Sequence, residues 1–160
     1  MSEQAVRDLG CCTLRSITEV AAASLADRMA TLDPWRRLDY EVAALRRYLA
    51  TDSPALVRHE IAVGGECAGV VAVRAPWLRG PYLELLAVLP EHQGRGIGAA
   101  VLRWLEAEAA PARNLWVMVS AFNEGARRFY ARHGFVEVGT VPGLVREGFD
   151  EVLMRKAMPD

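Results

Sequence analysis

The sequence predicts an α/β fold of the α+β kind, in which most neighbouring strands run antiparallel. Three observations support this prediction. Two segments with helical spacing of apolar residues come early, an alternating stretch with a Gly64-Gly65 turn follows, and a strand–turn–helix–strand unit occupies residues 82–120. A chain of 160 residues is long enough to bury one good core, so we expect residues 1–160 to form a single domain.

Capping residues, prolines and glycines set the boundaries of the expected elements. Thr18 and Asn123 suit helix N-caps, Pro111 ends the central helix, and Gly134 suits a left-handed helix stop. Residues 75–81, which include two prolines and a glycine, are expected to form a loop. In chain order, strands are expected at 11–15, 56–63, 67–74, 82–89, 115–120, 135–138 and 149–156, and helices at about 19–32, 38–50, 97–110 and 124–133.

Composition argues against several classes of protein. The net charge of −1 provides no electrostatic footprint for nucleic acid, and no basic helix suggests a membrane surface. No stretch approaches the roughly 18 apolar residues of a membrane span, and the polar N-terminus does not resemble a signal peptide. Three cysteines are too few and too irregularly spaced for a disulfide framework or a zinc site. We therefore expect a cytoplasmic protein with reduced thiols and no metal.

The most informative segment is the expected strand 82–89 and the glycine-rich turn that follows it. Gly94, Gly96 and Gly98 occupy alternate positions where the next helix begins. Glycine removes the side chains there, so backbone N–H groups can converge on an anion at the positive end of the helix dipole. A pyrophosphate is the ligand that suits such a turn best.

Three kinds of phosphate-binding loop compete for this segment. A Walker A loop requires a lysine and a hydroxyl after the last glycine, but Ala99-Ala100 stand there. The dinucleotide fingerprint is met by Gly94, Gly96 and Ala99, yet no carboxylate follows the next strand to hold a ribose. A nicotinamide-dependent oxidoreductase is thus a poor alternative. The third candidate, a coenzyme A loop, is supported by the rest of the chain.

The order of elements and motifs resembles the GNAT superfamily of acyl-CoA-dependent N-acyltransferases over nearly the whole chain. Two blocks carry the resemblance, namely Gln93-x-x-Gly96-x-Gly98 after a strand and Pro90, and Asn123…Ala126…Phe129-Tyr130…Gly134-Phe135. The resemblance implies a mixed, mostly antiparallel sheet of roughly six to seven strands flanked by about four helices, with a central βαβ unit. It also implies a V-shaped splay between the strands at 82–89 and 115–120.

The resemblance implies acetyl-CoA as co-substrate, with its pantetheine arm inserted between the parting strands. The arm would pair with the main chain of residues 86–88, and Arg95 would contact a phosphate beside the loop amides. Asn123 would reach the arm from the other wall. The cofactor-binding residues expected on this basis are Leu86, Ala87, Val88, Gln93, Gly94, Arg95, Gly96, Ile97, Gly98, Ala99, Asn123, Ala126 and Tyr130.

The implied reaction is direct attack of a primary amine on the thioester. Deprotonating an alkylammonium of pKa near 10.4 costs about 4.6 kcal/mol at pH 7, so a base is needed. Glu84 is our candidate because strand alternation puts it on one face with Leu86 and Val88. A water relay or another group stays open. Tyr130, seven residues after Asn123, matches the superfamily's general acid.

Three residues are expected to bind the acceptor, namely Trp35, Tyr82 and Glu84, whereas His92 is expected to be a solvated turn residue. The acceptor itself, an amine of a small molecule, peptide or protein, is not encoded in any motif. A non-catalytic acyl-CoA sensor is a second candidate function. By analogy with the superfamily, the chain is expected to form a homodimer.

Overall fold

The computed structural model describes residues 5–159. Its strands are β1 Arg7–Asp8, β2 Thr13–Arg15, β3 Leu56–Val63, β4 Glu66–Trp77, β5 Gly80–Val88, β6 Asn114–Ser120, β7 Val136–Pro142 and β8 Asp150–Ala157. Its helices are α1 Glu19–Met29, α2 Val42–Ala50, α3 Ile97–Ala109 and α4 Glu124–Arg132, with one short 3₁₀ helix, η1 Pro90–His92.

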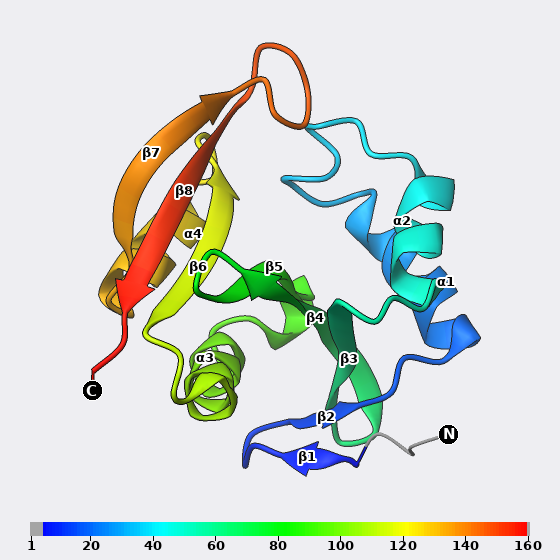
Figure 1. Ribbon diagram of the computed structural model, residues 1–160. Helices are drawn as coiled ribbons and strands as arrows, with labels where there is room; N and C mark the ends of the chain where they lie inside the picture. Colours follow the sequence, from blue (N-terminus) through cyan, green and yellow to red (C-terminus); the bar gives the residue numbers. More distant parts are fainter. Residues whose placement is uncertain (1–4, 160) are drawn as a thin grey trace.

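The described strands form one eight-stranded sheet in the order β1-β2-β3-β4-β5-β6-β8-β7 (Figure 1). Every neighbouring pair is antiparallel except β5 and β6, which are joined by the crossover helix α3. The predicted mostly antiparallel α+β fold is confirmed. The sheet has one strand more than expected because β1 folds back on β2 around Gly10, whose φ is +89°. A two-residue strand is too short to produce a readable pattern.

Helices cover both faces of the sheet, and two neighbouring residues of β4 show this because they pack into cores on opposite faces. Val70 packs with α1 and α2, whereas Val71 belongs to the core beneath α3, and both side chains are fully buried. This is the alternation expected of a strand that is covered on both sides. The α1–α2 core includes Leu25, Met29, Leu45 and Leu49, and the α3 core includes Ile97, Val101, Leu102 and Leu105.

The first two helices are shorter than expected. Thr18 does cap α1, because its Oγ1 accepts a hydrogen bond from the Ala21 amide at 3.1 Å. However, residues 30–41 form a series of turns around Pro34, with the Leu38 amide donating to the Pro34 carbonyl at 2.9 Å. We call this segment the 30–41 loop. It lies between the two helices and beside the central strands.

The loop expected at 75–81 is largely strand. β4 continues to Trp77 and β5 starts at Gly80, so a tight turn at Leu78-Arg79 joins them. The Trp77 ring stacks on Tyr82 with a centroid separation of 4.6 Å. It also meets Trp116 edge-on at 5.5 Å. Aromatic contacts of this kind add about 0.5–1.5 kcal/mol beyond burial. Pro76 is tolerated because it lies in the register irregularity between Arg74 and Trp77, where it has no partner on β5.

The central parallel pair separates soon after it begins. β5 and β6 are paired only at Tyr82–Trp116 and Leu83–Val117. β6 then stays paired with β8 as far as Ser120, while β5 stays with β4. The V-shaped splay between these strands is therefore present in the structure, as predicted.

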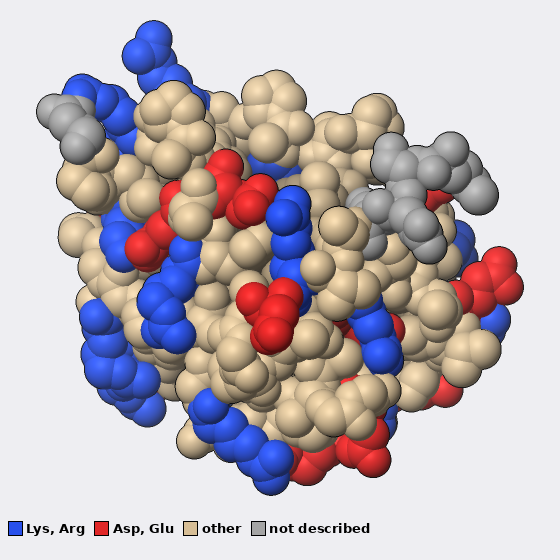
Figure 2. Space-filling model, turned by 90° about the horizontal axis from the view of Figure 1, so that it is seen from below, with Lys and Arg blue, Asp and Glu red and all other residues tan. Residues whose placement is uncertain are grey.

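Charged side chains of both signs are interspersed over the face seen in Figure 2. Among the helices in residues 5–159, none is both long and apolar enough to span a bilayer. Within the same residues, no group of three or more His, Cys, Asp and Glu side chains could hold a metal ion.

The contact between β4 and β5 depends on a glycine. A Cβ added to Gly69 would lie 2.0 Å from the carbonyl oxygen of Ala87, so Gly69→Ala must push the two strands apart. We expect a loss of about 1–3 kcal/mol in the free energy of unfolding, measured by urea titration. Gly139→Ala is the matched control, because nothing lies within 4 Å of its added Cβ, and should change stability by less than about 0.5 kcal/mol. Equal losses in the two variants would show that the strand contact does not depend on Gly69.

Candidate active site

A cavity of about 940 Å³ occupies the splay between β5 and β6 and extends to both faces of the sheet. We name its two ends by their chemistry. The glycine-loop half is lined by Leu86, Val88, Gln93, Gly94, Gly96, Ile97, Gly98, Ala99, Asn123, Ala126, Phe129 and Tyr130. The acidic half is lined by Met29, Asp33, Trp35, Tyr40, Tyr48, Tyr82, Glu84, Ser120, Leu144, Val145 and Glu151.

The glycine turn presents free amides at the start of α3. Gly94 and Gly96 have φ of +76° and +78°, in the left-handed region that favours glycine. Gly96 is the N-cap of α3 and makes no side-chain cap. The first helical hydrogen bond runs from the Ala100 amide to the Gly96 carbonyl at 3.0 Å, so the three amides before it have no helical partner. They lie at the positive end of the helix dipole and suit a phosphate.

Gly98 allows close packing of two helices as well as access of an anion to the loop amides. A Cβ added there would lie 2.9 Å from Cζ of Phe129, so this glycine allows α4 to approach α3 closely. The sequence pattern had indicated only a role in anion binding. Gln93 donates from Nε2 to the Val88 carbonyl at 2.9 Å and so braces the loop against β5. Arg95 is exposed and, alone among the predicted cofactor-binding residues, does not line the cavity.

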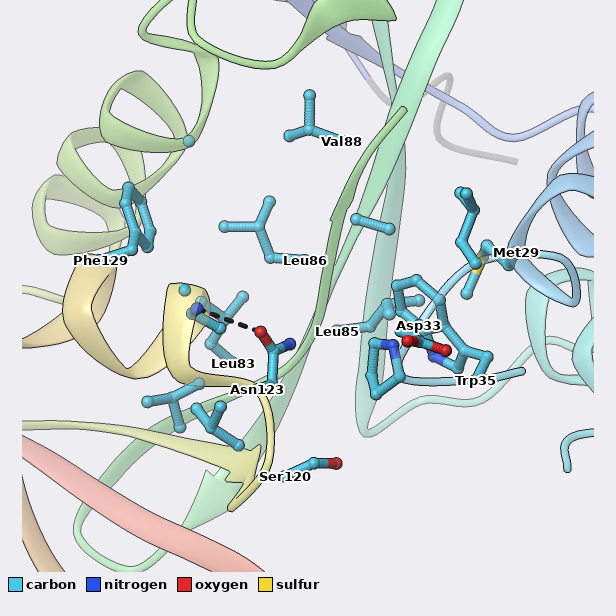
Figure 3. Close-up of a pocket in the computed structure, with 18 of the residues that line it drawn as sticks. Met29, Asp33, Trp35, Leu83, Leu85, Leu86, Val88, Ser120, Asn123 and Phe129 are labelled. Carbon is cyan, nitrogen blue, oxygen red and sulfur yellow. Dashed lines mark hydrogen bonds between the residues drawn. The ribbon is translucent and has the colours of Figure 1, made fainter. Parts of the chain in front are cut away.

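Asn123, the N-cap of α4, and Tyr130, within that helix, both line the glycine-loop half of the cavity. Asn123 caps the helix, because its Oδ1 accepts from the Ala126 amide at 3.2 Å, and its Nδ2 points into the cavity (Figure 3). Tyr130 lies between the rings of Phe129 and Phe135, at centroid separations of 5.1 and 5.4 Å. Burial and the neighbouring Tyr82 raise the pKa of the Tyr130 phenol. Its hydroxyl thus stays protonated at neutral pH and has no hydrogen-bond partner within residues 5–159.

A β-bulge at Glu84 changes which side chains of β5 share a face. Leu83 lies opposite Val73 and Leu85 opposite Ala72, so Glu84 is an extra residue without a partner on β4. Beyond it the alternation is shifted by one position. Figure 3 shows Leu86 and Val88 on the side of Phe129, and Leu85 on the side of Met29 and Trp35. The expectation that Glu84 shares a face with Leu86 and Val88 is therefore wrong.

Glu84 is held by two neighbours. Its Oε1 accepts from Arg74 Nε at 2.7 Å, and its Oε2 accepts from Arg74 Nη2 at 3.1 Å and from the Tyr48 hydroxyl at 2.7 Å. Burial and the bond to Glu84 raise the pKa of Tyr48. The bidentate contact with arginine makes Glu84 a fixed, compensated negative charge.

The acidic half also brings together groups from distant parts of the chain. Burial raises the pKa of Tyr82 to about 12, and the charges of Glu84 and Glu151 add to the increase. Tyr40 shows a raised pKa for the same reasons, with burial the largest. Trp35 lies in this half beside Asp33, as Figure 3 shows. All three predicted acceptor-binding residues therefore line the cavity.

Sequence reasoning missed Glu151 and Ser120, and it placed His92 wrongly. Glu151 is 5% exposed, and its Oε1 accepts from the Ser120 hydroxyl at 3.0 Å. No local pattern separates it from a surface glutamate, because only the pairing of β8 with β6 buries it. His92 is 7% exposed and lines the cavity, with no partner for Nδ1 in the described part of the chain. The 3₁₀ turn carries it inward, which its position in a turn did not reveal.

Comparison with known proteins agrees with this geometry. The sequence profile of the Acetyltransferase (GNAT) family matches residues 9–135. The chain belongs to this family. It is 36% identical over 108 residues to streptothricin acetyltransferase of Streptomyces lavendulae, covering 62% of this chain and 57% of that protein. It is 33% identical over 101 residues to an uncharacterized N-acetyltransferase of Methanocaldococcus jannaschii, covering 61% and 64%.

The match spans less than two thirds of the length of either of these relatives. Among solved structures, that of nourseothricin acetyltransferase is similar to this GNAT protein with a TM-score of 0.61 and 29% identity, over 68% of each chain. The family that the two sequence blocks suggested is confirmed.

The left-handed turn before α3 offers a test of anion binding. Gly96→Ala places a Cβ at a φ of +78°, which costs about 1–2 kcal/mol and displaces the free amides. We expect the affinity for CoA, measured by calorimetry, to fall about tenfold, which is about 1.4 kcal/mol. Gly143→Ala is the control, because its φ is +63° but it does not line the cavity. It should lose similar stability and keep its CoA affinity. A similar loss of affinity in both variants would count against the loop.

Proposed function

We propose that this protein transfers an acetyl group from acetyl-CoA to a primary amine of a small molecule or peptide. The observation that carries the proposal is the continuous cavity through the splay, with free amides at one end and carboxylates at the other. Membership of the GNAT family supports the donor. The arrangement lets donor and acceptor approach from opposite faces of the sheet and meet between β5 and β6.

The donor would bind through main-chain groups. Its diphosphate would lie on the amides of residues 97–99 at the start of α3. Beyond Leu83, the edge of β5 that faces β6 has no strand partner within the described residues. Its free N–H and C=O groups would pair with the amides of the pantetheine arm, as in the addition of a strand to a sheet edge. Asn123 Nδ2 would donate to the arm from the opposite wall.

The acceptor would enter the acidic half. Carboxylates and aromatic rings together suit a cationic amine, through charge and cation–π attraction. Trp35, Tyr82 and Glu84 are the acceptor-binding residues that we propose, with Tyr40 and Tyr48 beside them. One curated relative is named for streptothricin and one solved neighbour for nourseothricin. We therefore choose streptothricin as the first acceptor to test.

The chemistry requires a proton donor for sulfur and a proton acceptor for nitrogen. Tyr130 is the proposed acid, because its hydroxyl is protonated, lines the cavity and is not engaged in another hydrogen bond. Glu84 was the base proposed from sequence, but its contacts with Arg74 and Tyr48 favour electrostatic binding of the acceptor instead. A cytoplasmic location, a homodimer and a single domain over residues 1–160 stay predictions.

Removing one hydroxyl tests whether the protein is an enzyme or an acyl-CoA sensor. Tyr130→Phe keeps the ring between Phe129 and Phe135 but removes the proton donor. General acid catalysis contributes about 10²–10⁴-fold, so we expect kcat to fall at least about 100-fold. The affinity for acetyl-CoA should fall by less than about tenfold, since the phenol contributes one hydrogen bond to the sulfur and the phosphate loop stays intact. Thiol release would be followed with a chromogenic disulfide. Unchanged turnover would exclude Tyr130 as the acid, and no turnover in either protein would favour the sensor.

The choice of cofactor can be tested without an acceptor. Acetyl-CoA at about 100 times its dissociation constant should stabilise the folded protein by about 2.7 kcal/mol, seen as a higher melting temperature. NADH at the same concentration should cause no shift. A shift with NADH alone would revive the oxidoreductase alternative that Gly94, Gly96 and Ala99 left open.

A further inference from the structure

We propose that Glu151 is the general base that takes the proton from the acceptor ammonium. The inference rests on the proposed acetyl transfer and deepens it, since it assigns the proton acceptor to a strand at the far side of the splay. Three observations carry it: the face on which Glu151 lies, its lack of a counter-cation, and the loops that enclose it.

The register of β6 and β8 puts Glu151 in the acidic half. Val119 and Val152 are directly paired, and both belong to the core under α3. The next pair, Ser120 and Glu151, must therefore point to the opposite face of the sheet. The Ala121 amide donates to the Asp150 carbonyl at 2.9 Å, so the pairing continues where the chain leaves β6. Glu151 thus lies on the β6 wall of the splay, across from Glu84 on the β5 wall.

Charge pairing distinguishes Glu151 from the other carboxylates of the cavity. Asp33 is paired with Arg36 at 3.3 Å, and Glu84 with Arg74 at 2.7 Å. Glu151 has no cation within 4.0 Å in the described part of the chain, although it is the most buried of the three. Burying an ionised carboxylate without a counter-ion lowers the free energy of unfolding unless a ligand supplies a positive charge. A protonated amine is the ligand that would do so.

Two loops enclose Glu151 from the open side. Tyr40 of the 30–41 loop and Leu144 and Val145 of the loop between β7 and β8 line the same half of the cavity. Arg146 of the second loop meets Asp39 of the first at 3.6 Å, and Figure 1 shows the two segments approaching each other above the splay. They separate the carboxylate from bulk water, which strengthens both its attraction for an ammonium and its basicity.

The titration behaviour of the group agrees with this geometry. Burial raises the pKa of Glu151, and the hydrogen bond from Ser120 opposes part of the increase. The titratable groups nearby are the phenols of Tyr40 and Tyr82, which stay neutral because their own pKa values are raised. Glu84 also raises the pKa of both phenols and is itself compensated by Arg74. A carboxylate with a raised pKa is a better proton acceptor than an exposed one.

The proposed step balances. The carboxylate of Glu151 takes one proton from the ammonium, and the freed nitrogen lone pair attacks the thioester carbonyl carbon. The new C–N bond forms, the carbonyl re-forms, and the C–S bond breaks with its electron pair on sulfur. The nitrogen then loses a second proton, and the sulfur gains one proton from the Tyr130 hydroxyl. The second proton from nitrogen restores that hydroxyl. The first proton leaves Glu151 for water, so an ammonium and acetyl-CoA give an amide, CoA thiol and one released proton.

Glu151→Gln removes the base and keeps the shape. With streptothricin as acceptor, we expect kcat/KM to fall about 100-fold or more. The rising limb that Glu151 sets should disappear, which leaves only the rise at higher pH that follows deprotonation of the amine itself. Asp150→Asn, an exposed neighbour on the same strand, should behave like wild type. Ser120→Ala should keep the rising limb and move it to higher pH, because the hydroxyl that stabilises the carboxylate is lost.

Glu84→Gln separates the two carboxylates. We expect this variant to raise KM and to keep the rising limb. If Glu84→Gln loses the limb while Glu151→Gln retains it, Glu84 is the base and our inference is overturned. If the wild-type protein acetylates neither streptothricin nor any of a panel of diamines and peptides, the proposed function fails instead.

A stability measurement tests the uncompensated carboxylate without any acceptor. The folded protein binds the Glu151 proton more tightly than the unfolded chain does, so the ionised group lowers stability above the ordinary titration range of glutamate. Glu151→Gln should therefore raise the melting temperature at pH 8 and have little effect near pH 4. A difference that does not change with pH would show that Glu151 is already compensated, and would overturn the inference.

Discussion

The rest of the site depends on the early end of pairing between β5 and β6. Two parallel strands in the middle of a sheet ordinarily satisfy each other along their length, but here only Tyr82 and Leu83 of β5 have partners on β6. The bulge at Glu84 increases the local twist of β5, while the pairing of β6 with β8 carries it in another direction through Ser120. The cavity lies between the two strands, where β5 stays paired with β4 and β6 stays paired with β8.

This separation leaves polar groups that the folded chain alone does not satisfy. They are the free edge of β5 beyond the bulge, the amides at the start of α3, and the buried carboxylate of Glu151. Each of these groups is matched by part of a proposed substrate. Such local exceptions to good packing and pairing are expected at functional sites. The compensated charge of Glu84, by contrast, resembles an ordinary structural ion pair that also faces the cavity.

The two faces of the sheet present different chemical groups to the cavity. The face under α3 and α4 presents main-chain donors and the phenol of Tyr130, which suit a long, polar, anionic ligand. The other face presents carboxylates and rings from α2, β5, β8 and the 30–41 loop, which suit a cation. Within the described residues, the cavity at the splay is lined from both faces of the sheet. In the transfer that we propose, neither substrate would have to move through the sheet.

The sequence by itself determined most helices and strands and the glycine turn with its free amides, because these features depend on residues that are near one another in the chain. The caps at Thr18 and Asn123 and the glycine turn before α3 are local devices of this kind. Only the tertiary structure revealed that Glu84 is paired with Arg74 and that His92 is buried. It also revealed that Gly98 packs against Phe129, where a side chain would not fit. Contacts between segments far apart in sequence settle these points. The bulge shows the limit most clearly: one extra residue in β5 reverses every side chain after it, and only pairing with β4 reveals it.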